Sequence, residues 1–174
     1  GPIATGIRAA MAASKARSAV SASPPTRVRL WSALMRKTST PLPAVRKIEI
    51  AGDCACGWMS PDEYLIVLPY TGVDAAIASL NIALKGQHFL VADVSDARAV
   101  FRVEGVRAAQ VLAKLSPVDF ATLEEGELRR TRAAQVAAAF WEHGDGFTVV
   151  CFRSVGRYVF DLLASSATTG SELA

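Results

Sequence analysis

The sequence predicts an α+β protein in which helices cover one face of an antiparallel or mixed sheet. Short strand-like runs of apolar residues alternate with segments of helical spacing, in the order β, α, β and then β, α, β, β, α. This order predicts two consecutive βαβ-like units, followed by an added hairpin and a terminal helix. The expected architecture is a sandwich of the split βαβ type.

The first unit is predicted over residues 47–94. Residues 47–51 alternate like an edge strand, and residues 54–63 are expected to form a link that ends in a tight turn. The apolar run 64–68 is typical of a strand that is covered on both faces. A strand at 89–94 follows a helix whose apolar residues are Val73, Ile77, Leu80 and Leu84.

The second unit begins with a predicted strand at residues 98–104, in which Arg98, Arg102 and Glu104 alternate with apolar side chains. Gly105 precedes a helix with one apolar stripe. The stripe consists of Ala108, Val111, Leu112 and Leu115. An acidic, glycine-containing loop is expected at 118–130.

Two paired strands, 133–141 and 147–152, are predicted on either side of the glycine-rich hairpin connection 142–146. The alanine-rich run at 133–139 also has good helix propensity, so a helix is the alternative there. A final helix places Val155, Tyr158, Val159 and Leu162 on one face.

The charges predict a separate amino-terminal arm. Residues 1–48 hold nine of the 19 Lys and Arg residues and none of the 16 Asp and Glu residues. We expect a basic, largely extended arm at 1–46, a single α+β domain at 47–166 and a polar tail at 167–174. A short amphipathic helix is expected near 28–37, with its apolar side chains on one side. These side chains, Leu30, Trp31, Leu34 and Met35, are candidates for binding a partner or for packing on the chain's own sheet.

Other partners fit the composition less well. A nucleic-acid site usually interleaves basic and aromatic residues, whereas the arm offers only Trp31, so no nucleic acid is expected. No apolar run approaches the roughly 20 residues of a membrane span, so no membrane is expected either. Three cysteines without a disulfide framework are typical of a reducing cytoplasm.

A metal site is not expected. Cys54 and Cys56 are separated by one residue, whereas zinc-binding pairs usually have two to four residues between them. His88 and His143 lie far apart, and Cys151 stands alone. The glycines at 144–146 are explained by a hairpin turn, because no P-loop lysine follows them.

Several sequence motifs resemble those of one known family, both in their residues and in their order along the chain. These motifs are WMSPDEYLIVLP, DVSDARAVFRVEG, a helix ending in VLAK, and a closing FRS followed by Tyr158. Residues 47–165 are similar to the gamma subunit of heterotetrameric sarcosine oxidase. The resemblance implies a fold similar to the folate-binding domain of aminomethyltransferases. It also implies partners of the alpha, beta and delta type, which carry FAD, FMN, NAD, zinc and tetrahydrofolate, and no cofactor on this chain.

The candidate catalytic groups have structural explanations. Asp93 and Asp96 are suited to an acid–base pair, but a strand end and a turn explain them better. Arg98 and Arg102 are candidates for binding a partner or a carboxylate. Asp119 is the one catalytic candidate, because the resemblance implies that a related aspartate acts at folate in aminomethyltransferases. We therefore expect a structural subunit, with a stand-alone folate-binding or folate-dependent transferase as the alternative.

Overall fold

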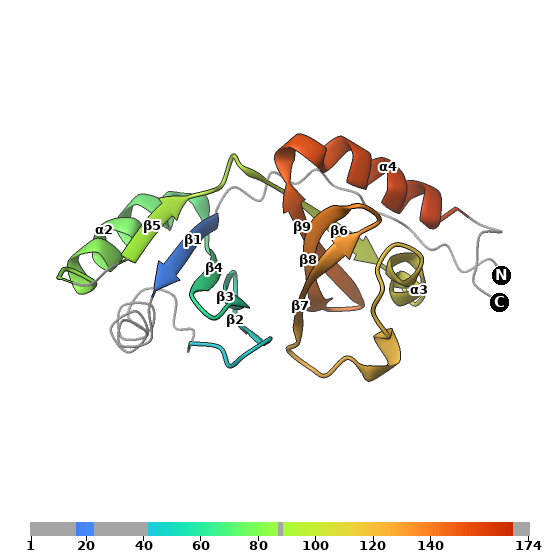
Figure 1. Cartoon of the computed structure of the whole chain (residues 1–174), viewed down its shortest axis with the longest axis horizontal. Helices are drawn as coiled ribbons and strands as arrows, with labels where there is room; N and C mark the ends of the chain where they lie inside the picture. The colour runs from blue at the N-terminus through green and yellow to red at the C-terminus, as the bar shows by residue number, and fades with distance from the viewer. Residues whose placement is uncertain (1–16, 23–41, 87–88, 169–174) are drawn as a thin grey trace. The chain divides into compact units, whose positions relative to one another are not determined.

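The computed structural model describes residues 17–22, 42–86 and 89–168 (Figure 1). The chain divides between Asp96 and Ala97 into two compact units, each built on one sheet. The single domain expected over 47–166 therefore differs from the structure, because each sheet forms a core with its own helices. Within the described ranges, no helix has the length and apolar character needed to cross a membrane.

The amino-terminal unit contains a five-stranded sheet in the order β2-β3-β4-β1-β5, with antiparallel neighbours. Its strands are β1 Arg17–Ala22, β2 Ile48–Ala51, β3 Cys54–Ser60, β4 Glu63–Val67 and β5 Phe89–Asp93. Because β1 is antiparallel to both β4 and β5, the latter two run parallel to each other. The 3-10 helix η1 (Tyr70–Gly72) and helix α2 (Val73–Ala83) connect them. This arrangement is a split βαβ unit, as predicted.

Strand β1 lies inside the segment expected to be a separate arm. Val20 stands opposite Tyr64 of β4 and Val91 of β5 in the two registers. The backbone of β1 thus supplies hydrogen-bond partners to two strands, which its sequence RSAVSA does not signal because it offers only one large apolar residue. The expected helix near 28–37 lies outside the described residues.

Strand β3 occupies the region expected to be a link. Its side chains are buried or partly buried along its whole length, so it lacks the alternation that marks a half-exposed strand. It also lacks β-branched residues. The expected tight turn is present, because Ser60 and Glu63 are paired and the Ser60 hydroxyl donates to Asp62 Oδ1 at 2.7 Å.

The core of this unit lies between α2 and the sheet. Val73, Leu80 and Leu84 are at most 2% exposed and pack with buried residues of β3 and β4. Tyr64 and Ile66 of β4 belong to the same cluster. The predicted helical stripe and the fully covered strand are therefore confirmed.

The carboxyl-terminal unit has a four-stranded antiparallel sheet in the order β6-β9-β8-β7. Its strands are β6 Arg98–Glu104, β7 Leu128–Ala133, β8 Val136–His143 and β9 Gly146–Phe152. Helices α3 (Ala108–Ala113) and α4 (Gly156–Ser166) pack against one face of this sheet. In the sequence, the short helix η2 (Phe120–Thr122) follows α3, and η3 (Arg153–Val155) directly precedes α4. A terminal helix is confirmed. It buries Val159 and Leu163, however, and Tyr158 of the predicted apolar face is 44% exposed.

Strands β6 and β7 form the two edges of this sheet, and β9 and β8 lie between them. One detail of this unit differs from the predictions. The strand expected at 133–141 contains a hairpin, in which Ala134 adopts a φ of +51°. The Ala134 N–H donates to the carbonyl of Leu115 at 2.7 Å, so the segment after α3 anchors a turn that no glycine or asparagine marks.

Candidate functional site

Strand β6 presents its charged side chains on the sheet face opposite the helices. Phe101 and Val103 are buried in the cluster formed with α3 and α4. Arg98, Arg102 and Glu104 alternate with them and are partly exposed. The alternation predicted for this strand is therefore confirmed, and it places both candidate arginines on one surface.

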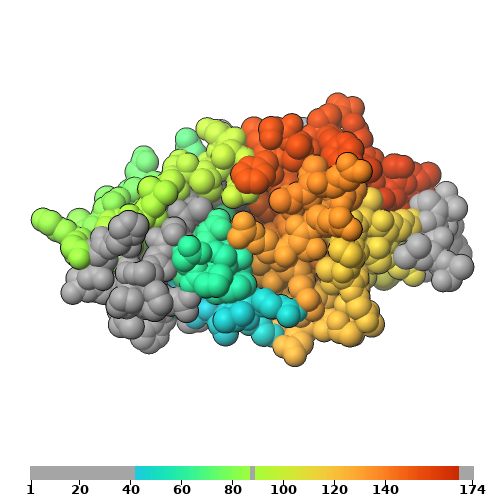
Figure 2. Space-filling model, viewed as in Figure 1, coloured from blue at the N-terminus to red at the C-terminus, as the bar shows by residue number. Residues whose placement is uncertain are grey.

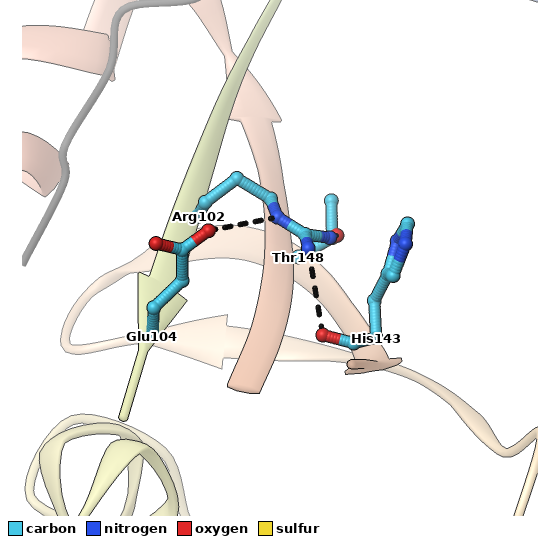
Figure 3. A network of polar contacts seen from close by, with 4 residues as sticks. All are labelled: Arg102, Glu104, His143 and Thr148. Atoms are coloured by element: carbon cyan, nitrogen blue, oxygen red, sulfur yellow. Dashed lines mark hydrogen bonds and ion pairs between the residues drawn. The ribbon is translucent and has the colours of Figure 1, made fainter. Parts of the chain in front are cut away.

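Arg102 is held by its own sheet (Figure 3). Its Nη1 donates to Thr148 Oγ1 at 2.6 Å, and its Nη2 donates to the His143 carbonyl at 3.4 Å. The Arg102 Nε lies 3.9 Å from Glu104 Oε1. Because three groups of β6, β8 and β9 already use this guanidinium, Arg102 is suited to fastening the sheet rather than to gripping a partner.

The same network acts on the imidazole of His143. Burial and, to a smaller extent, the positive charge of Arg102 lower the pKa of His143 below its ordinary value of 6.5. The folded state therefore favours the neutral ring. Its contribution to stability is full above pH 6.5 and is lost as the pH falls through the lower folded-state pKa.

We expect an NMR titration of the His143 ring to give a midpoint below 6.5, the ordinary value. The Arg102→Gln variant should raise that midpoint, because it removes the neighbouring charge. The chain has two histidines, and the ring resonance that disappears in a His143→Gln variant is that of His143. A wild-type midpoint at or above the ordinary value contradicts the lowered pKa, and an unchanged midpoint in Arg102→Gln contradicts the effect of Arg102.

Arg98 is placed differently from Arg102. Its guanidinium carbon lies 4.1 Å from the ring centroid of Phe152, which stands opposite Arg98 in the β6–β9 register. Phe152 is 47% exposed. Among the described residues, no carboxylate forms an ion pair with Arg98. This contact is a cation–π interaction, and an arginine placed over an aromatic ring can still use its N–H groups to bind a carboxylate.

Asp119 caps a short helix. Its Oδ1 accepts from the Ala121 N–H at 3.0 Å, and its carbonyl accepts from the Thr122 hydroxyl at 2.9 Å. The next residue, Phe120, stacks on Phe140 with 5.3 Å between the ring centroids. The carboxylate thus has a structural partner at the start of η2, and this turn fixes an aromatic side chain of the core.

Asp93 has a similar local role. Its Oδ1 accepts from both the N–H of Ser95, at 2.8 Å, and the Ser95 hydroxyl, at 2.5 Å. Asp93, which the sequence placed at a strand end, is therefore a turn acceptor. This pattern is an Asx turn at the end of β5.

The thiols lie in apolar surroundings. Cys56 and Cys151 are buried in the two separate cores, and Cys54 is partly exposed. Burial, with a smaller contribution from Glu49, raises the pKa of the Cys56 thiol to about 12. Burial and the neighbouring Asp53 also raise the pKa of Cys54. In the described ranges, no group of three or more His, Cys, Asp and Glu side chains is placed to hold a metal ion.

These pKa directions give a prediction for thiol reactivity. Cys54 should react with iodoacetamide slowly at pH 7.5, and Cys56 and Cys151 should react only after denaturant is added. Mass spectrometry of the alkylated peptides, with and without denaturant, measures the order. Fast labelling of Cys56 in the native chain contradicts its placement in the core.

Two groups of candidate residues remain: the glycines of the β8–β9 hairpin, and four apolar residues that lie outside the described ranges. Residues 144–145 connect β8 to β9, and Gly144 has a φ of +63°, so the expected hairpin turn is present. Leu30, Trp31, Leu34 and Met35 lie outside the described residues, and their role as partner-binding candidates stays a prediction. Sequence reasoning missed the part played by Phe152, whose position opposite Arg98 depends on the β6–β9 register.

Comparison with known proteins adds an independent observation. No family model matches the sequence. Subunit gamma of sarcosine oxidase from Corynebacterium sp. (strain U-96) is 34% identical over 119 residues. A chain of heterotetrameric sarcosine oxidase from Corynebacterium sp. U-96 superposes with a TM-score of 0.73 and 24% identity, covering 91% of this chain and 83% of that chain. The chain is therefore similar in sequence to the sarcosine oxidase gamma subunit.

The likeness covers only part of each of two relatives. The matched region is 66% of this chain and 57% of the gamma subunit, so the chain spans a little over half the length of that relative. Aminomethyltransferase T of the glycine cleavage system from Bartonella henselae shares the fold, with a TM-score of 0.61, 16% identity and coverage of 85% of this chain and 42% of that one. The predicted similarity to both folds is confirmed.

Proposed function

We propose that the chain is a small, non-catalytic gamma subunit of a heteromeric, flavin-dependent complex like sarcosine oxidase. In this proposal, the complex oxidatively demethylates sarcosine or a related N-methyl amino acid in the cytoplasm and passes the one-carbon unit to tetrahydrofolate. Larger alpha- and beta-type chains and a delta-type chain carry FAD, FMN, NAD, zinc and tetrahydrofolate. This chain contributes to assembly.

The observation that carries the proposal is the agreement between sequence and fold. The 34% identity to a subunit gamma falls on a chain whose fold matches a sarcosine oxidase chain at a TM-score of 0.73. The local geometry supports a structural role as well, because Asp119 caps η2 and Asp93 closes a turn. Arg98, stacked on Phe152, is the side chain best suited to a carboxylate of a partner.

Ligand titration of the isolated chain separates this function from the alternative. Tetrahydrofolate and FAD are added separately, and the fluorescence of Trp58 and Trp141 is followed. A structural subunit should show no saturable change at micromolar concentrations of either ligand. Saturable binding of tetrahydrofolate that Asp119→Asn abolishes would instead support a folate-binding or folate-dependent transferase. Asparagine keeps an oxygen that accepts the Ala121 N–H, so this variant should preserve the cap.

A further inference from the structure

Strand β5 is an edge of the five-stranded sheet. Among the described residues, its only strand partner is β1, which pairs with Phe89–Asp93 along its full length. An edge strand leaves alternate backbone N–H and C=O groups on its second side without a sheet partner. In the space-filling view, the yellow-green atoms of this region lie at the surface (Figure 2).

The side chains of β5 make this edge apolar. Phe89 and Val91 pack toward the core under α2. Leu90 alternates with them onto the opposite sheet face and is 64% exposed. No charged side chain occurs before Asp93 at the end of the strand. A strand added here would find hydrogen-bonding groups along the edge and an apolar side chain beside them.

The other sheet edges carry features that discourage pairing. The Ser116 hydroxyl donates to the carbonyl of Arg132 in β7 at 2.6 Å. The side chains of Arg130 and Arg132 in this strand are exposed. Strand β6 carries Arg98, Arg102 and Glu104. Strand β2 has only four residues and contains Glu49. Short edges and charged side chains are the usual protection of exposed strands. In β5 the one charged side chain, Asp93, stands at the end of the strand, so residues 89–92 carry no charge.

We propose that β5 is a docking edge for an extended segment of a larger partner subunit, which joins the sheet as a sixth strand and covers Leu90 with apolar side chains. The proposal rests on the proposed function, because it assigns the surface by which this chain enters the complex. An extended segment is favoured over a helix, because only an extended backbone can form hydrogen bonds with the regularly spaced N–H and C=O groups of an edge strand. Alternate apolar residues are required on the face that meets Leu90.

The test uses the complex reconstituted from the full chain and its alpha- and beta-type partner subunits. The Leu90→Lys variant is compared with Val106→Lys, a matched change at a side chain that is 80% exposed in the other unit. We expect Leu90→Lys to weaken association by about tenfold or more, and Val106→Lys to leave it unchanged. Circular dichroism should show that both variants fold, because both side chains are exposed.

Hydrogen–deuterium exchange tests the strand itself. Backbone amides of residues 89–93 should exchange about tenfold or more slowly in the complex than in the isolated chain. Equal exchange in both, or unchanged affinity of Leu90→Lys, overturns the docking edge while assembly of the wild type upholds the proposed function. Amides already protected in the isolated monomer would show that the chain's own residues cover β5. Protection that appears with a Leu90-dependent homodimer would assign the edge to a second copy, and absence of wild-type assembly would overturn both proposals.

Discussion

Replacing Phe140 with alanine is expected to lower the free energy of unfolding by about 3–5 kcal/mol. Phe140 is 1% exposed and lies at the centre of an aromatic cluster in the carboxyl-terminal unit. Its ring stacks on Phe120 at 5.3 Å and meets Phe147 edge-on at 6.1 Å between centroids. Truncation removes both contacts and leaves a cavity that a close-packed core cannot fill. Equilibrium unfolding in urea measures the change.

The matched control is Phe152→Ala, in the adjacent strand of the same sheet. Phe152 is 47% exposed and stacks on Arg98 rather than on the core. Its truncation should change the free energy of unfolding by less than about 1 kcal/mol. Equal losses from the two variants would contradict the assignment of Phe140 to the core and of Phe152 to the surface.

Gly146→Ala is expected to destabilise the chain by about 3 kcal/mol or more, which lowers the Tm by roughly 6–12 °C. A Cβ at this position would lie 2.0 Å from the carbonyl oxygen of Val103 and 2.9 Å from the Cα of Glu104. Both atoms belong to the backbone of β6, so no side-chain rotation relieves the clash. Strand β9 would have to separate from β6 where Glu104 pairs with Gly146.

Gly72→Ala provides the comparison for this change. Its backbone φ is −95°, which alanine adopts without strain, and the nearest atom to the added Cβ is Leu68 Cδ1 at 3.2 Å. That atom is the end of a flexible side chain. A Tm change of a few degrees or less is therefore expected in differential scanning calorimetry. A tolerated Gly146→Ala would mean that β6 and β9 do not approach as closely as the structure shows.

The elements with clear periodicity were predictable from the sequence, and those defined by pairing were not. The stripe Val73, Leu80 and Leu84 identified α2, because a helix that packs on a sheet needs apolar residues at those intervals. Strand β1 carries no such signal. Its place in the sheet depends on backbone pairing with β4 and β5, which side-chain pattern does not encode for a run of small residues.

The same limit explains the β7–β8 hairpin. A two-residue turn with positive φ usually contains glycine or asparagine, whereas this one uses Ala134 and is anchored by the carbonyl of Leu115. Leu115 follows the end of α3 and precedes β7 by more than ten residues in the sequence. Long-range contacts of this kind are visible only in the folded chain.

The candidate site was predictable in part for a similar reason. Alternation placed Arg98 and Arg102 on one face of β6, and the structure agrees. Their different roles follow from the neighbouring strands, because β9 brings Thr148 to Arg102 and Phe152 to Arg98. The sequence of β6 alone cannot distinguish an arginine that fastens a sheet from one whose N–H groups stay open to a partner.

The central claim is that this chain serves a larger flavoenzyme as a structural subunit. The most direct measurement is affinity purification of the tagged full chain from its native host, with mass spectrometry of the retained proteins, the flavin absorbance spectrum and sarcosine oxidation by the eluate. We predict that alpha- and beta-type sarcosine oxidase subunits elute with it in fixed proportion, together with bound flavin and activity. Recovery of a complete and active flavoenzyme from the same cells without this chain, while the tagged chain elutes alone, would contradict the claim.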